Sequence, residues 1–117
     1  RIASSVSGVN PNSCLLNVGN LYVNRAALSQ LFYVAAEGFE TNQIIVQLAN
    51  SGKAISKARI LYKASTANGP MLDIFIRTAK TNQLTLSYSC NMNLTFQSPV
   101  EVPEEPDEGY SVKEFTF

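Results

Sequence analysis

Few side chains in this sequence are suited to catalysis. The chain contains no histidine, the commonest general base and a frequent metal ligand. Before residue 100 the carboxylates are only Glu37, Glu40 and Asp73. A glycosidase needs two carboxylates that face one cleft, whereas Glu37 and Glu40 have the spacing of a solvated helix surface. Serines are abundant, but no obvious base could activate one. We therefore predict a protein that is not an enzyme, with no catalytic residue, metal site or cofactor.

The two cysteines, Cys14 and Cys90, are the remaining reactive side chains. Their wide separation excludes a CxxC redox motif and a four-ligand zinc site. They are either unrelated buried thiols or one long-range disulfide, and the low charge with many Ser, Thr, Asn and Gln favours the disulfide. Such a bond would contribute roughly 4 kcal/mol in the chain-entropy model. It also indicates an oxidising compartment, so we expect a secreted or periplasmic protein.

Composition limits the possible partners. The chain has 117 residues, enough for one domain, and charged residues make up 15% of it, against about 25% in an average soluble protein. Cations exceed acids up to residue 100, and acids exceed cations after it, so the net charge is zero. The cations are scattered and accompany no nucleic-acid motif, so we expect no nucleic-acid partner. No segment approaches the ~20 apolar residues of a membrane span.

The strongest structural signal is an alternation of apolar and polar residues from 84 to 96. It predicts an antiparallel strand with its apolar side inward. A single strand of this length would be far longer than usual, so we expect a bend, or a hairpin near Cys90–Asn93. Cys90 has the inward parity, as do the residues expected in the core. These are Leu84, Leu86, Tyr88 and Leu94, whereas Thr85, Ser87 and Thr95 should be exposed.

One helix is expected, over residues 25–37. Asn24 is a suitable N-cap, Gly38 a suitable stop, and an apolar stripe recurs at i, i+3, i+4 and i+7. The stripe consists of Leu28, Leu31, Phe32 and Ala35.

Short strands are expected around this helix. They are Cys14–Val18, Ile44–Leu48 and Ile55–Ala64, with a strand or a short helix after Pro70. The elements together predict a β-rich α+β fold, a small antiparallel barrel or sheet of OB-like type packed with one helix. The alternative is a cystatin-like helix on a sheet.

The C-terminal residues differ in kind from the rest. We assign residues 1–100 to a single β-rich domain and residues 101–117 to an acidic linker with an apolar end. That end contains Tyr110, Val112, Phe115 and Phe117. Free tails do not usually carry such a cluster, so we expect it to dock on its own domain or on a neighbouring chain. Asn93 begins a glycosylation triplet, Asn93-Leu94-Thr95.

One stretch resembles a known family. Residues 75–84, Phe-Ile-Arg-Thr-Ala-Lys-Thr-Asn-Gln-Leu, which run on to Tyr88-Ser89-Cys90, are similar to the segment before the last half-cystine in B subunits of pertussis-like AB5 toxins. The order of elements is similar over residues 14–90. The stretch 50–66 is longer here than in that family, and the residues after Cys90 have no counterpart. The resemblance implies an OB-fold, a ring of subunits, glycan binding without catalysis, and the cysteine pair.

These observations favour a secreted, non-enzymatic binding subunit that recognises cell-surface glycans within a toxin-like oligomer. The alternative is a structural or assembly component of a cell-surface or secretion apparatus, because the long strand and the apolar C-terminal end suit an interlocking subunit. An inhibitor-like domain of cystatin type is a third interpretation. Expected partners are copies of the chain itself, other protein subunits, or a glycan. No ligand-binding residue can be assigned from the sequence.

Overall fold

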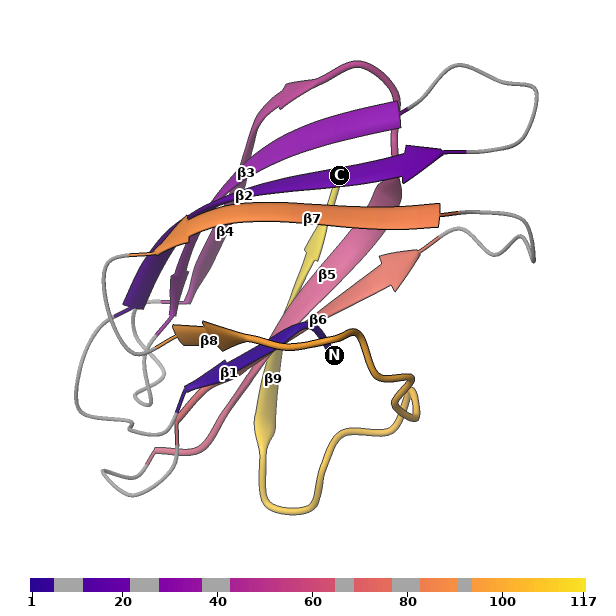
Figure 1. Cartoon of the computed structure of the whole chain (residues 1–117). Helices are drawn as coiled ribbons and strands as arrows, with labels where there is room; N and C mark the ends of the chain where they lie inside the picture. The colour runs from indigo at the N-terminus through magenta and orange to yellow at the C-terminus, as the bar shows by residue number, and fades with distance from the viewer. Residues whose placement is uncertain (6–11, 22–27, 37–42, 65–68, 77–82, 91–93) are drawn as a thin grey trace.

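The computed structural model describes residues 1–5, 12–21, 28–36, 43–64, 69–76, 83–90 and 94–117. These residues form two antiparallel sheets and contain no helix (Figure 1). The strands are β1 (Ala3–Ser5), β2 (Asn12–Leu21), β3 (Leu28–Ala36), β4 (Ile44–Asn50), β5 (Ile55–Tyr62), β6 (Met71–Ile76), β7 (Gln83–Cys90), β8 (Leu94–Phe96) and β9 (Ser111–Thr116). Sheet A has the order β8-β1-β6-β5-β9, and sheet B has the order β4-β3-β2-β7.

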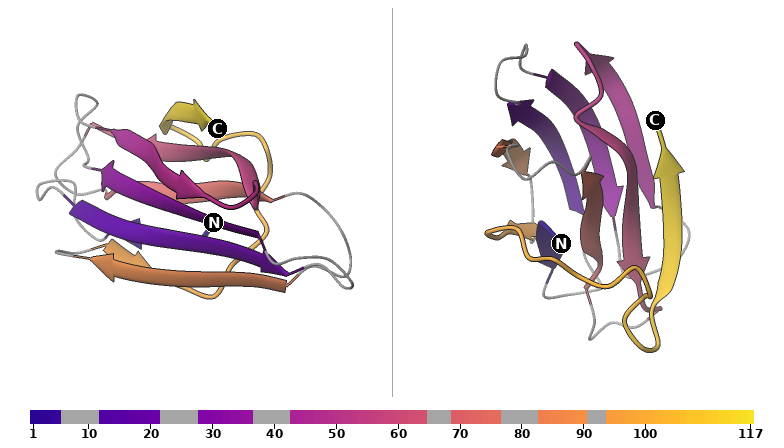
Figure 2. Two further views of the ribbon diagram at one scale, coloured as in Figure 1. Left: turned by 90° about the horizontal axis from the view of Figure 1, so that it is seen from above. Right: turned by 90° about the vertical axis from the view of Figure 1, so that its right-hand side faces the viewer.

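The core lies between the two sheets, and on sheet B it follows from the alternation of buried with less buried residues along β2 and β3. On β2 of sheet B the side chains of Cys14, Leu16 and Val18 are buried. Ala58 and Ile60 of sheet A belong to the same buried cluster. Alternate residues of a strand point to opposite sides, so one side of each central strand can be wholly apolar. The β-rich antiparallel class expected from the sequence is therefore confirmed, and Figure 2 shows the layers from two further directions.

The helix expected over residues 25–37 is wrong where the structure describes it, because residues 28–36 form strand β3. Of the expected helical stripe only Phe32 is buried, and the observed burial has a period of two in which Phe32, Val34 and Ala36 point inward. Gln30 continues this inward row, and its amide donates to Gln47 at 2.8 Å and accepts from the Ile55 N–H at 2.6 Å. The polar side chain of Gln30 can therefore occupy a core position, because both its amide nitrogen and its amide oxygen are hydrogen-bonded. Sheet packs on sheet, and no helix covers either one within the described residues, in contrast to both expected architectures.

The alternating segment 84–96 is broken as expected, but it does not form a hairpin. Strand β7 pairs with β2 in sheet B, whereas β8 pairs with β1 in sheet A, so the chain changes sheets between them. The inward parity holds, because Leu94 is buried and Leu84 and Leu86 are half-buried against the core. Thr85, Ser87 and Thr95 are exposed, as expected. The expected burial of Tyr88 is wrong, since its side chain is 54% exposed at the open side of the sandwich.

The other strand predictions hold with shifts at the ends. Strands cover Ile44–Leu48 and most of Ile55–Ala64, and the residues after Pro70 form strand β6, not a helix. Strand β1, which pairs with β6 and β8, is not among the strands predicted from the sequence. No helix among the described residues has the length and apolar character to cross a membrane.

The apolar C-terminal end docks on its own domain. Strand β9 pairs with β5 over six register positions, and the right-hand view of Figure 2 shows it at the margin of the molecule. Phe115 and Phe117 pack against the core, and the rings of Phe117 and Phe32 lie 4.7 Å apart between centroids. Residues 111–117 are thus a structural part of the sandwich.

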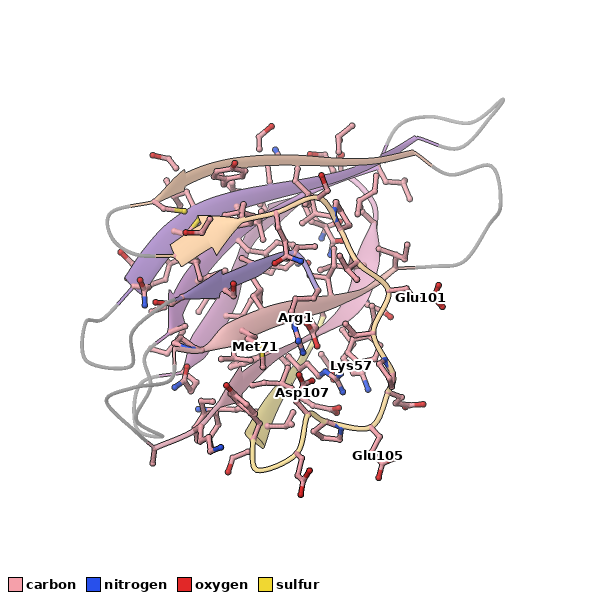
Figure 3. All side chains as sticks on the ribbon, turned by 60° about the horizontal axis from the view of Figure 1, so that its bottom comes forward. Arg1, Lys57, Met71, Glu101, Glu105 and Asp107 are labelled. Carbon is pink, nitrogen blue, oxygen red and sulfur yellow. The ribbon has the colours of Figure 1, made fainter. Side chains whose placement is uncertain are left out.

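The acidic segment between β8 and β9 crosses the outer face of sheet A, where two arginines hold it. Arg59 donates to the carbonyl oxygens of Pro103 and Glu104. Arg1 binds Asp107 through both carboxylate oxygens, at 2.8 and 3.1 Å. Figure 3 looks onto this face and shows Arg1 and Asp107 inside the curve of the segment, with Glu105 at its outer margin. The cations of the body and the acids of the tail therefore attract each other within one chain.

Candidate docking surface

Strand β4 is a free edge of sheet B. Within the described residues it pairs with β3 alone, so the backbone groups on its other side have no neighbouring strand. Its seven residues, Ile44–Asn50, carry no charge. Natural edge strands are usually protected by charges, proline or very short length, because unpaired backbone groups accept further strands. β4 has only a bulge, opposite Leu31 and Phe32.

The outward side of β4 is apolar. Ile44, Val46 and Leu48 are 43, 45 and 52% exposed, while the inward Ile45 is buried. A strand that borders solvent on its outer side normally alternates apolar with polar residues. Here apolar side chains occupy both sides, and no described element of the chain covers the outer one.

The exposed apolar residues continue onto the neighbouring strands. In the register of sheet B, Val46 pairs with Tyr33, and Tyr33 pairs with Leu15. Tyr33 is 39% and Leu15 48% exposed. Ile44, Val46 and Leu48 lie on the edge strand itself, whereas Tyr33 and Leu15 lie one and two strands away from the edge. We call the three exposed residues of β4 the β4 apolar row. Contiguous exposed apolar side chains of this kind mark interaction sites in soluble proteins, whereas scattered single ones do not.

The other three edge strands differ from β4. Strand β8 has only three residues, and β9 exposes the charged side chains of Lys113 and Glu114. Strand β7 is uncharged, but its outward residues Thr85, Ser87 and Ser89 are polar. The described part of the chain thus combines a free edge with an apolar outward row only at β4.

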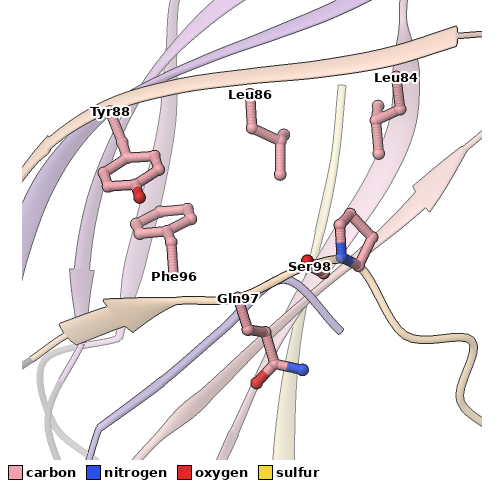
Figure 4. A pocket seen from close by; sticks show the side chains of 7 residues that line it. Leu84, Leu86, Tyr88, Phe96, Gln97 and Ser98 are labelled. Carbon is pink, nitrogen blue, oxygen red and sulfur yellow. The ribbon is translucent and has the colours of Figure 1, made fainter.

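A second candidate site lies at the seam between the sheets, where β7 faces residues 96–99. It is a pocket of about 340 Å³ lined by Leu84, Leu86, Tyr88, Phe96, Gln97, Ser98 and Pro99 (Figure 4). The side chains of Leu84, Leu86 and Tyr88 point from β7 toward the opposite segment. The rings of Tyr88 and Phe96 are stacked, with centroids 3.9 Å apart and planes 8° from parallel. Phe96 therefore covers one face of the Tyr88 ring, and the remainder of the Tyr88 side chain accounts for its high exposure.

A larger cavity of about 770 Å³ adjoins this pocket through Leu84 and Pro99. It surrounds the end of β6, with Ile74 and Ile76 on one side and the ion pair of Arg59 with Asp73 on another. Asp73 binds Arg59 and Arg1, each at 3.0 Å, so this carboxylate has a structural role. The acidic segment adds two further carboxylates to the lining, those of Glu101 and Glu104.

The two cysteines lie directly opposite each other on β2 and β7. Their Sγ atoms are 2.9 Å apart, with the Cys90 thiol donating to Cys14, whereas a disulfide bond is about 2.05 Å long. The expected bond is therefore absent from the structure, which contains two free thiols, but the expected proximity is present. Burial, aided by the hydrogen bond from Cys90, raises the pKa of Cys14 to about 12.

Several residues singled out in the sequence lie outside the described residues: Glu37, Glu40, and Asn93 of the glycosylation triplet. In the described ranges no three Cys, Asp, Glu or His side chains are grouped as metal ligands. The sequence predicted β4 as a strand but not its position at the edge of a sheet. The signal that was available is an uncharged run with apolar residues at consecutive positions, Ile44-Ile45-Val46.

No protein-family model matches this chain, and comparisons with curated proteins and with solved structures found no match either.

Proposed function

We propose that this chain is a non-enzymatic assembly subunit that binds another protein chain by strand addition at β4, beside the β4 apolar row. The observation that carries the proposal is the free, uncharged edge of β4 with Ile44, Val46 and Leu48 exposed beside it. A partner strand that adds to β4 would satisfy the open backbone groups, and its side chains would cover this row. This is the role of a structural component of a cell-surface or secretion apparatus, in a secreted or periplasmic setting.

A labelled strand-forming peptide tests this function. The probe is a fluorescent seven-residue peptide of alternating valine and threonine, which supplies backbone donors and acceptors without charge. Anisotropy should show saturable binding to the wild-type chain and at least a roughly tenfold weaker affinity for Val46→Lys, because edge lysines prevent strand addition. Leu15→Lys is the matched control, since Leu15 is equally exposed but lies two strands from the edge. Equal binding by wild type and Val46→Lys would contradict the proposal.

Glycan recognition is a second candidate function, favoured by the half-exposed ring of Tyr88. This ring shares a pocket with the polar side chains of Gln97 and Ser98. An aromatic surface beside a few polar groups is a common design for small-ligand sites. The resemblance to pertussis-like toxin B subunits supports the same role, and the OB-like closure and ring assembly it implies remain predictions. On a glycan array, binding that Tyr88→Ala removes and Thr85→Ala keeps would support this function.

A further inference from the structure

We propose that the chain bound at β4 is a second copy of this protein, with the two β4 strands antiparallel about a twofold axis at Val46. This inference rests on the proposed assembly function and specifies its partner. The pairing would join two four-stranded sheets into one continuous sheet across the axis.

The exposed residues Ile44 and Leu48 lie two positions on either side of Val46, with Leu48 at the bulge. In antiparallel pairing, directly opposite residues point to the same side of the sheet. With Val46 on the axis it faces Val46 of the partner subunit, and Ile44 faces Leu48 of the partner subunit. Every outward pair is then apolar, and such cross-strand pairs each contribute roughly 0.2–1 kcal/mol.

Charge also favours a second copy as the occupant. A twofold axis at Val46 places two copies of every charge on the strand within a short distance of each other, and a charge at position 46 would directly face its own duplicate. β4 has none from Ile44 to Asn50. The nearest described cation that follows, Lys53, is held by the carbonyl oxygen of Phe117 at 2.6 Å. The edge can therefore meet itself without repulsion.

A head-to-tail arrangement, in which β4 pairs with β7 of the next copy, is less favourable. The four strands of sheet B are all antiparallel, so β4 and β7 run in opposite directions and could pair. That contact would place the apolar outward row of β4 beside the exposed Thr85 and Ser87. It would also leave a free β4 at one end unless the copies close into a ring. The self-pairing of β4 matches apolar with apolar and closes after two copies.

The test uses opposite charges at the axis. We would compare wild type, Val46→Lys, Val46→Glu and the control Leu15→Lys by sedimentation velocity over a range of concentrations. Wild type and Leu15→Lys should shift toward dimer as concentration rises. Val46→Lys and Val46→Glu alone should dimerise more weakly by roughly tenfold or more, because like charges face each other across the axis. An equimolar mixture of the two should recover dimer, as opposite charges then meet.

Each outcome decides one part of the inference. Recovery in the mixture supports both the second copy and the register. Failure to recover, with circular dichroism showing both variants folded, would overturn the pairing at Val46. A wild-type chain that stays monomeric yet binds the strand-forming peptide would overturn the second copy as partner and leave the assembly function standing. Loss of dimer in Leu15→Lys but not in Val46→Lys would show face-to-face packing in place of edge pairing.

Discussion

Arg59 and Asp73 face each other across the β5–β6 ladder, with Nε and Oδ2 3.0 Å apart and both side chains 3% exposed. This buried ion pair lies on the outer face of sheet A, where charged residues would ordinarily be solvated. It is buried because residues 99–107 cross this face, and Arg59 also holds their carbonyl oxygens. The acidic segment and the ion pair therefore depend on each other.

Asp73→Ala should strongly destabilise the fold. The substitution leaves Arg59 and Arg1 without their shared carboxylate, and breaking a buried pair in this way costs about 3–5 kcal/mol. Glu114→Ala is the matched control, because Glu114 binds Lys57 at 3.2 Å but is 49% exposed. Its loss should change the free energy of unfolding by less than about 1 kcal/mol. Urea denaturation measures both, and similar losses from the two variants would show that the Asp73 cluster is solvated.

Stability should fall in acid partly through Asp107. The Arg1 guanidinium hydrogen-bonds this carboxylate and holds its pKa below the ordinary value. The unfolded chain therefore binds the proton more readily, so the contribution is complete above the ordinary pKa and disappears as pH falls through the lower folded value. Because Asp107 is 41% exposed, the effect should stay below about 1 kcal/mol. Urea titrations of wild type and Asp107→Asn should converge at the acid end. A constant difference across the pH range would contradict this.

Oxidation should link Cys14 to Cys90 within one chain. The thiols are already paired in register, so diamide, a two-electron oxidant, can remove both hydrogens and form the S–S bond with little movement of the strands. The reaction should accelerate as pH rises, because Cys14 with a pKa of about 12 is almost wholly protonated at neutral pH. Intact mass and non-reducing electrophoresis follow it, with Cys90→Ser as control. Intermolecular adducts in place of the internal bond would contradict the observed register.

Phe117→Ala should destabilise the domain, because its ring packs on the core and against Phe32. A half-buried aromatic ring of this kind should contribute about 1–3 kcal/mol. Thr116→Ala, at the exposed neighbouring position, should change stability by less than about 0.5 kcal/mol. Thermal and urea unfolding give both values. Equal stability of the two variants would mean that the C-terminal end is not part of the sandwich in solution.

The sequence predicted the inward parity of segment 84–96, because alternation on a strand is a local property. It predicted the proximity of the cysteines from their number and the composition of the chain. It could not show that β7 and β8 belong to different sheets, since that depends on pairing with β2 and β1, which are distant in the chain. The burial of Tyr88 was predicted wrongly for the same reason. Its parity is inward, but the seam between two sheets leaves an inward side chain partly open.

The mistaken helix has a different cause. Leu28, Leu31, Phe32 and Ala35 satisfy a helical period, while the strand period needs Gln30 to be buried. Burial of Gln30 becomes acceptable only through Gln47 and the Ile55 N–H, two partners that a local pattern does not contain. The edge position of β4 could not be predicted either, because it depends on which strands pair, and these are distant from one another in the sequence.

The most direct measurement of the central claim is backbone amide hydrogen exchange at low and high protein concentration. If copies associate through β4, the amides of Ile44–Asn50 that point away from β3 should exchange more slowly at high concentration. The charged edge strand β9 should exchange at the same rate at both, and Val46→Lys should abolish the difference at β4. Exchange at β4 that is independent of concentration, or protection that arises at β9, would contradict the account.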